Sequence, residues 1–271
     1  MRRMSDPTKR FTSRVDNYAK YRPGYPDDLV DLLNSECELN ENSVIADVGS
    51  GTGILSALFL KRGNEVIGVE PNAAMRSAAE ILLERYSRFR SVDGSAEATT
   101  LPTKSVDLIL AGQAFHWFNR PKARIEFLRI LKPLGFVVLI WNDRRLASTH
   151  FLSAYEDLLQ KYGTDYQQVS HLNVTGEIAE FFAPDTFELR IFENSQRLDF
   201  GSLKGRVCSA SYTPEPGHPQ FEPMLAQLRE IFEANQVDGA VSFDYDTRVY
   251  YGRLMQADSL PQSLTRSRAV Q

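Results

Sequence analysis

Three glycines at alternate positions separate a β-branched run from a helical pattern in the segment IADVGSGTGILS, residues 45–56. The residues before the glycines are typical of a short buried strand, and residues 53–63 carry apolar side chains at helical spacing. A glycine loop between a strand and a helix presents unpaired backbone N–H groups at the positive end of the helix dipole. This feature predicts an α/β fold with a ligand site at the loop.

Strand-like and helix-like segments alternate around this loop. The expected strands are 43–48, 65–70, 89–94, 105–112 and 135–141, and the expected helices are 53–63, 72–86 and 120–133. Apolar strands that alternate with helices and end at Gly or Pro indicate a parallel sheet with both faces covered. In such a doubly wound, Rossmann-like sheet, the ligand lies at the carboxyl ends of the strands.

The pattern changes after residue 142. Two segments are expected to be mostly helical, namely 147–182, with breaks at Gly163 and Gly176, and 202–236, with an interruption at 213–219. Residues 186–193 and 240–254 alternate like strands, which predicts an antiparallel C-terminal edge on a sheet of seven strands. The helices between these two late strands are expected to cover the active edge.

The organisation that we expect is one domain with additions to a central core. Its parts are an N-terminal helical lid (1–40), a Rossmann-like core that binds the ligand (41–142), the last strands with a helical substrate cap (143–260), and a disordered tail (261–271). A chain of 271 residues is long enough for one large domain of this kind.

Composition narrows the classes of partner. The net charge of −4 and the pI of about 5.7 imply no broad basic face, which argues against nucleic acid. The start of the chain does not resemble a secretory signal, and no stretch is apolar enough to predict a membrane span. Two distant cysteines, Cys37 and Cys208, form no disulfide framework and no metal-ligand pattern. We therefore expect a cytoplasmic protein, monomeric or homodimeric, without a metal.

The residues around the glycines discriminate between nucleotide-like ligands. A triphosphate loop requires Gly-Lys-Ser/Thr, but Gly53 is followed by Ile54. A dinucleotide loop requires Gly-x-Gly-x-x-Gly, and neither possible frame fits. An acid at the mouth of the loop, Asp47, would repel a pyrophosphate and suits a ligand with an ammonium group.

The stretch VIADVGSGTG resembles the first motif of the class I S-adenosylmethionine-dependent methyltransferases. The segment 92–110 is similar to that family's G-D-A-E-x-L-P stretch, and 111–119 to its Q/S-x-x-H-W loop. Residues 11–26 resemble the N-terminal lid of the branch that includes trans-aconitate methyltransferase. The resemblance implies transfer of a methyl group from S-adenosylmethionine to a small-molecule substrate, a carboxylate in that branch.

The resemblance also implies a set of cofactor-binding residues: Asp47, Gly49, Ser50, Gly51, Glu70, Pro71, Met75, Ser95, Ala96, Gln113, Ala114, Tyr18 and Arg22. An acid about 20 residues beyond the glycines, Glu70, is expected to accept hydrogen bonds from both ribose hydroxyls. Ser95 stands where many relatives have Asp, and its hydroxyl is expected at the adenine amino group. Tyr18 would cover the cofactor, and Arg22 would pair with its carboxylate.

For the acceptor, the resemblance implies contacts from Tyr21, His116, Trp117, Ser211 and Tyr212. A carboxylate acceptor needs no base, whereas a hydroxyl or amine needs one, and His116 is the candidate. Structural roles stay open as well: His116 would then only order its loop, and the lid aromatics would only pack on the sheet edge. The alternative functions are an NAD(P)-dependent oxidoreductase and a non-catalytic module that binds S-adenosylmethionine.

Overall fold

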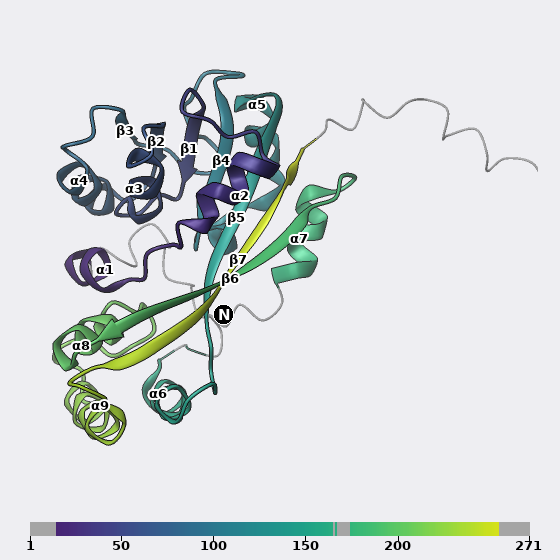
Figure 1. The fold of residues 1–271 in the computed structure, drawn as a ribbon. Helices are drawn as coiled ribbons and strands as arrows, with labels where there is room; N and C mark the ends of the chain where they lie inside the picture. The colour runs from purple at the N-terminus through teal and green to yellow at the C-terminus, as the bar shows by residue number, and fades with distance from the viewer. Residues whose placement is uncertain (1–14, 165, 167–173, 255–271) are drawn as a thin grey trace, which may run out of the picture.

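A single seven-stranded sheet organises the chain in the computed structural model, which describes residues 15–164, 166 and 174–254 (Figure 1). Its strand order is β3-β2-β1-β4-β5-β7-β6. The strands are β1 (Val44–Val48), β2 (Glu65–Val69), β3 (Phe89–Val92), β4 (Val106–Gly112), β5 (Leu131–Arg144), β6 (Glu188–Leu198) and β7 (Val241–Arg253). The expected doubly wound α/β fold is confirmed.

Strand direction divides the sheet into two parts. Strands β1 to β5 pair in parallel, while β7 is antiparallel to both β5 and β6. The antiparallel edge predicted from the late alternating segments is therefore present. Strand β7 lies between β5 and β6, so β6 is the outermost strand on this side.

The helices begin and end close to the positions that the sequence predicts. They are α1 (Val15–Tyr21), α2 (Asp28–Glu36), α3 (Ile54–Leu60), α4 (Ala73–Leu82), η3 (Phe115–Trp117), α5 (Arg120–Ile130), α6 (His150–Tyr162), α7 (Val174–Phe182), α8 (Phe200–Cys208) and α9 (Phe221–Asn235). Polar N-caps fix several starts. For example, the Asn72 side chain accepts a hydrogen bond from the Met75 backbone N–H at 3.1 Å.

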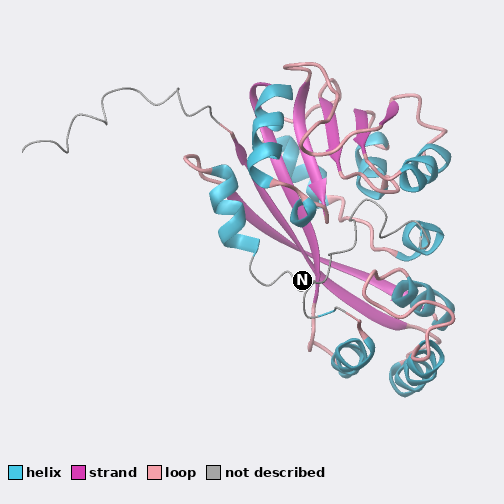
Figure 2. Cartoon of the chain, turned by 180° about the vertical axis from the view of Figure 1, so that it is seen from behind, coloured by secondary structure: helices cyan, strands magenta, loops and turns pink. Residues whose placement is uncertain are grey.

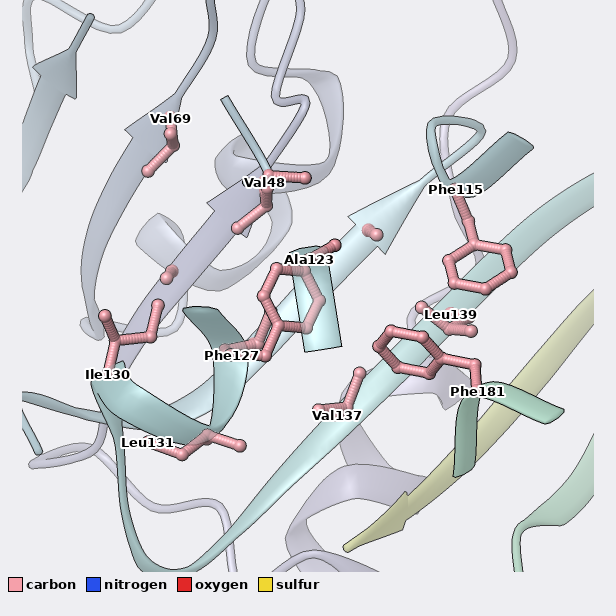
Figure 3. Packing of buried hydrophobic residues seen from close by; sticks show 14 of the residues in the cluster. Val48, Val69, Phe115, Ala123, Phe127, Ile130, Leu131, Val137, Leu139 and Phe181 are labelled. Atoms are coloured by element: carbon pink, nitrogen blue, oxygen red, sulfur yellow. The ribbon is translucent and has the colours of Figure 1, made fainter. Parts of the chain in front are cut away.

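One face of the sheet is covered by α5 and α7. Phe127 of α5 and Phe181 of α7 lie over β4 and β5, with ring centroids 5.8 Å apart (Figure 3). Helices α2 and α3 cover the opposite face, where Leu33 and Phe59 are fully buried. Because successive side chains of a strand point to opposite faces, the continuous apolar runs of β1 and β4 supply both layers.

The long strands β6 and β7 continue past these helices into another apolar cluster (Figure 2). Helices α6, α8 and α9 pack around it, with Phe243 and Tyr245 of β7 at its centre. We call this part the cap: α6, α8, α9 and the ends of β6 and β7 that they cover. The cap thus grows from the same strands as the core.

Helix α1 lies between α4 of the core and α8 of the cap, as Figures 1 and 2 show from opposite sides. The ring of Tyr21 rests on Gly205 of α8, where an added Cβ would stand only 2.1 Å from the ring. The backbone carbonyl of Gly24, just after α1, also binds two strands of the sheet: it accepts hydrogen bonds from Asn142 at 3.0 Å and Asn194 at 2.9 Å. The expected lid segment is therefore fixed to both halves of the molecule.

Three boundaries differ from the prediction. Gly176 lies inside α7 rather than at a break, because its position is open and a helix tolerates glycine there, whereas Gly163 does end α6. Strand β5 starts at Leu131, inside the segment expected to be helical, because Leu131 pairs with Val106. Strand β6 reaches Leu198 because its late residues pair with β7 in the cap. Residues 1–14 of the expected lid and the tail at 261–271 lie outside the described residues.

Candidate functional site

The polar residues of the predicted site follow the carboxyl ends of neighbouring parallel strands. Asp47 is the penultimate residue of β1, Glu70 follows β2, and Gln113 follows β4. Strands β2 and β3 lie on one side of β1, and β4 lies on the other side. Ligands bind at such a switch in strand order in open α/β sheets. The topology alone therefore brings these three residues to one edge.

All three glycines of the loop have positive φ, but an added Cβ would meet different surroundings at each of them. At Gly49 an added Cβ would lie 2.6 Å from Cβ of Ala114, and at Gly53 it would lie 2.5 Å from Cδ1 of Leu83. Close packing therefore requires these two glycines. At Gly51 an added Cβ would meet no protein atom within 4 Å. The space beside Gly51 is open to a ligand.

Glu70 is held against the glycine loop. Its carboxylate accepts hydrogen bonds from the backbone N–H groups of Gly51 and Asn72, both at 2.9 Å. The residue is 9% exposed, and burial raises the pKa of this carboxyl against the effect of the two hydrogen bonds. Each oxygen still has acceptor capacity toward a ligand.

Asp47 lies deeper and is 1% exposed. Burial raises the pKa of Asp47 to about 7, although the hydroxyl of Ser56 donates a hydrogen bond to its carboxylate at 2.6 Å. Repulsion from Glu70 raises this pKa further. A cationic group placed here would favour the ionised form.

Two cavities open at this edge of the sheet. The smaller, of about 180 Å³, has walls from the glycine loop, the residues after β2 and the loop after β4. Of the predicted site residues, those that line it are Tyr18, Gly49, Gly51, Glu70, Pro71, Met75, Ser95, Ala96, Gln113, Ala114 and Trp117. Met75 and Ala96 are buried apolar walls, while Glu70 and Ser95 supply polar groups.

The larger cavity, of about 860 Å³, extends from the glycine loop to the cap. The predicted residues on its wall are Tyr18, Arg22, Asp47, Gly49, Ser50, Gly51, Gln113 and Tyr212. Tyr18, Gly49, Gly51, Gly112 and Gln113 line both cavities, so the two spaces share one wall. Gln113 has φ of +56°, a conformation that is uncommon for a residue with a side chain, and its Nε2 donates to the Asn142 carbonyl at 3.2 Å.

Three predicted residues line neither cavity: Tyr21, His116 and Ser211. Tyr21 packs on α8, as described above. His116 lies in η3 with its ring 4.6 Å from that of Trp117, on the side of the smaller cavity. The geometry thus gives no support to His116 as a base for an acceptor in the larger cavity.

Sequence reasoning missed several residues on the wall of the larger cavity. The Thr52 hydroxyl is buried, has no hydrogen-bond partner among the described residues, and lines this cavity. Arg206 of α8 and Arg144 at the end of β5 also line it. The position of Thr52 in the glycine loop could have identified it as a site residue. Arg206 is a single arginine in an amphipathic helix, and no motif around it indicates a site.

No cluster of three or more potential metal ligands occurs in the described part of the chain. No helix there is long and apolar enough to cross a membrane.

Comparisons with known proteins agree with this arrangement. Residues 46–139 match the methyltransferase domain family. An uncharacterized methyltransferase of Schizosaccharomyces pombe is 31% identical over 227 residues, which cover 82% of this chain and 87% of the relative. A protein of Saccharomyces cerevisiae, named as a probable S-adenosylmethionine-dependent methyltransferase, is 28% identical, with 88% of this chain and 94% of that protein covered.

Solved structures show the same fold. One from Anaeromyxobacter dehalogenans, named as a type II methyltransferase, superposes with a TM-score of 0.63 at 21% identity and covers 86% of this chain and 98% of that one. The glycine loop lies within the matched domain. The alignment to the Schizosaccharomyces relative is much longer than this domain. From its sequence, its sheet and the position of its site, this chain belongs to the methyltransferase family.

Proposed function

We propose that this protein transfers a methyl group from S-adenosylmethionine to a small acceptor that carries a carboxylate. The observation that carries the proposal is the pair of adjoining cavities, one against Glu70 and the other against Arg22 and Arg206, which share a wall at Gln113. A cofactor whose adenosine occupies the first cavity and whose amino-acid part reaches past that wall toward Asp47 would meet an acceptor in the rest of the second cavity. The name of the Saccharomyces relative supports the choice of cofactor.

The residues present fit this cofactor. Glu70 would accept hydrogen bonds from the ribose hydroxyls, and Met75 and Ala96 would flank the adenine. Asp47 would pair with the ammonium group, and the partnerless Thr52 hydroxyl would find a partner in the amino-acid part. The open space beside Gly51 would allow the ligand to approach the backbone.

Bound S-adenosylmethionine supplies a methyl group on a positively charged sulfur. A carboxylate oxygen of the acceptor would form the new O–C bond as the C–S bond breaks, and the electron pair of that bond would stay on sulfur. The protein's part is to align the two ligands and to exclude water, and positioning of this kind contributes about 7–11 kcal/mol in favourable cases. Tyr18, which lines both cavities, would cover the reacting groups.

The groups on the wall of the larger cavity favour an acceptor that needs no base. Within the described ranges, no histidine lines this cavity. Three of its carboxylates already form ion pairs with arginines: Asp143 with Arg248, Glu156 with Arg144, and Asp246 with Arg145. A carboxylate acceptor is already an anion and requires no proton transfer.

Titration calorimetry with S-adenosylhomocysteine tests the cofactor site. We expect micromolar binding to the unaltered protein and a loss of roughly ten- to hundredfold in Glu70→Ala, because two charge-assisted hydrogen bonds disappear. Glu80→Ala is the matched control, because Glu80 lies exposed on the neighbouring helix α4. Binding that is absent, or equal in both variants, would refute the cofactor assignment.

Transfer of a labelled methyl group to a panel of carboxylic acids tests the reaction. We expect a product that mild base hydrolyses to methanol, since only a carboxyl methyl ester behaves in this way. A base-stable product would place the methyl on a hydroxyl oxygen, nitrogen, sulfur or carbon and would refute the carboxylate. Binding without any transfer would favour the non-catalytic module, while the methyltransferase relatives already argue against a nicotinamide-dependent oxidoreductase.

A further inference from the structure

Two guanidinium groups in the larger cavity have no carboxylate partner among the described residues. Arg206 is 7% exposed, and within the described ranges its guanidinium donates from Nε to the Tyr245 hydroxyl at 3.3 Å. Arg22 donates from Nη2 to the Ser209 carbonyl at 3.1 Å, and its buried Nε has no partner. Both side chains line the cavity.

The other arginines on the same wall are different. Arg144 is paired with Glu156 and also donates to the Tyr166 hydroxyl at 2.9 Å, and Arg248 lies 3.0 Å from a carboxylate oxygen of Asp143. The chain therefore neutralises Arg144 and Arg248 with carboxylates and leaves Arg22 and Arg206 as a pair of positive charges where Arg22 meets α8.

The two free charges act on each other. Burial, and after it the positive charge of Arg206, lowers the pKa of Arg22. Burial also acts on Arg206, but the oxygens of Tyr245, Tyr155 and Tyr212 outweigh it and keep the pKa of Arg206 above its ordinary value. Aromatic faces compensate part of the cost, since Arg22 lies 4.8 Å from the Tyr18 ring centroid and Arg206 lies 5.4 Å from that of Phe243. Two like charges without a counter-ion remain unfavourable in a buried site.

The pair also joins two parts of the molecule. Arg22 follows α1, while Arg206 lies in the last turn of α8, and the carbonyl that Arg22 binds belongs to the residue that ends this helix. Tyr18, one turn before Arg22, lines the smaller cavity as well as the larger one. An anion between the two arginines would remove their repulsion and hold α1 against the cap, with Tyr18 over the cofactor.

We propose that Arg22 and Arg206 form an anion subsite that binds a carboxylate of the acceptor, and that an acid bound there raises the affinity for the cofactor. A carboxylate suits this place because the planar guanidinium groups can each donate two hydrogen bonds to it. By thermodynamic linkage, the cofactor must raise the affinity for the acid by the same factor. The identity of the second ligand rests on the proposed function. The subsite also gives Arg22 a role toward the acceptor in place of the cofactor carboxylate.

Calorimetry with two probes tests the subsite. S-adenosylhomocysteine is titrated into the protein at constant ionic strength, without addition, with glutarate, or with the neutral analogue glutaramide. We expect glutarate to increase the affinity about fivefold or more and glutaramide to have no effect. In Arg206→Gln the increase should vanish, and the affinity for glutarate itself should fall about tenfold or more.

Arg248→Gln is the matched control, because Arg248 lines the same cavity but is paired with Asp143. It should keep the effect of glutarate within about twofold. Arg206→Lys, which keeps the charge, should keep part of it, and the affinity for S-adenosylhomocysteine without acid shows whether each variant is folded. Equal effects of glutarate and glutaramide, no effect of glutarate in the unaltered protein, or a full effect in Arg206→Gln would overturn the proposal.

Failure of the subsite and failure of the proposed function give different results. If S-adenosylhomocysteine binds but glutarate does not change its affinity, the subsite is refuted and the cofactor site stands. If S-adenosylhomocysteine does not bind, the cofactor site is refuted. A thermal shift by glutarate alone, lost in Arg206→Gln and kept in Arg248→Gln, would then still support the pair of arginines.

Discussion

The core and the cap share two long strands, β6 and β7, but build their walls of the site in different ways. In the core, each polar residue lies at or just after the carboxyl end of a parallel strand, so Asp47, Glu70 and Gln113 converge by topology. In the cap, Arg206 comes from a helix and Tyr212 from the turn beyond it, and both reach the cavity only through packing on β7. A site for a shared cofactor can be encoded locally, whereas a site for a particular acceptor depends on how distant segments meet.

The largest expected effect tests whether core and cap are one folding unit. Phe127→Ala removes a fully buried ring from the core, and Phe243→Ala removes one from the cap. Each should lower the free energy of unfolding by about 3–5 kcal/mol. Because β6 and β7 pass through both the core and the cap, we expect a single transition in both variants.

Urea unfolding followed by two probes measures this. Both tryptophans of the chain, Trp117 and Trp141, lie in the core, so their fluorescence reports core unfolding, while circular dichroism reports all helices. The two curves should coincide in each variant. A fluorescence transition that Phe243→Ala leaves unchanged would show that the cap unfolds independently.

The next effect concerns the glycine loop of the core. Gly49→Ala combines a positive φ with a Cβ placed 2.6 Å from Ala114. We expect a loss of about 2–4 kcal/mol in the free energy of unfolding and at least hundredfold weaker binding of S-adenosylhomocysteine. Gly176→Ala, at an open position in α7, should be neutral or stabilising. Normal binding by Gly49→Ala in calorimetry would contradict the close packing of this loop.

A smaller effect is expected where α1 meets the cap. Gly205→Ala would push a Cβ into the Tyr21 ring, whereas at Gly201 in the same helix the nearest atom lies 3.6 Å away. We expect Gly205→Ala to cost about 1–3 kcal/mol by thermal melting and to weaken S-adenosylhomocysteine several-fold through Tyr18. Gly201→Ala should change neither quantity. Equal behaviour of the two variants would mean that α1 does not depend on this contact.

The smallest effect is the pH dependence that Asp47 gives to the core. Its pKa of about 7 lies above the value in an unfolded chain, so its contribution to stability is present at low pH and is lost as the pH rises through 7. A ligand ammonium group favours the ionised form, so binding should release up to one proton below pH 7. The affinity for S-adenosylhomocysteine should then fall by at most about tenfold, or 1.4 kcal/mol, for each pH unit below 7.

Calorimetry at several pH values, in buffers with different ionisation enthalpies, measures the released proton. Asp47→Asn removes the titrating group. Its affinity for S-adenosylhomocysteine should be lower and nearly constant between about pH 5.5 and about pH 8. A pH profile that is the same in both proteins would assign the titration to another residue.

Much of the core could be predicted because its signals are local. The segment around Gly49 and Gly51 contains a strand, a loop and a helix start within a dozen residues, and each follows from residue type and spacing. The alternation of strands and helices then predicted that the carboxyl ends of the parallel strands share one edge of the sheet. Strand ends were harder, because β5 and β6 are extended by pairing partners far away in the chain.

The residues of the site likewise differ in how far the sequence could predict them. Of the predicted residues, those in the smaller cavity belong mainly to short motifs, and the structure brings them together. His116 and Ser211 stand next to cavity residues in the sequence but do not line the cavities, because a helical turn or a tight turn directs neighbouring side chains differently. Arg206 had no local signal, since its meaning depends on the absence of a carboxylate near its buried guanidinium group.

The sequence by itself determined the doubly wound sheet, the place of the glycine loop and the acidic residues at the ends of β1 and β2, because periodicity and strand topology dictate them. Only the tertiary structure decided that α1 rests on α8 and that the cavity continues into the cap. It alone decided that two of the arginines on the cavity wall have no carboxylate partner among the residues that the structure describes. The reason is physical: a backbone pattern is set by neighbours in the chain, whereas the charge balance of a cavity is set by side chains that meet only after the chain has folded.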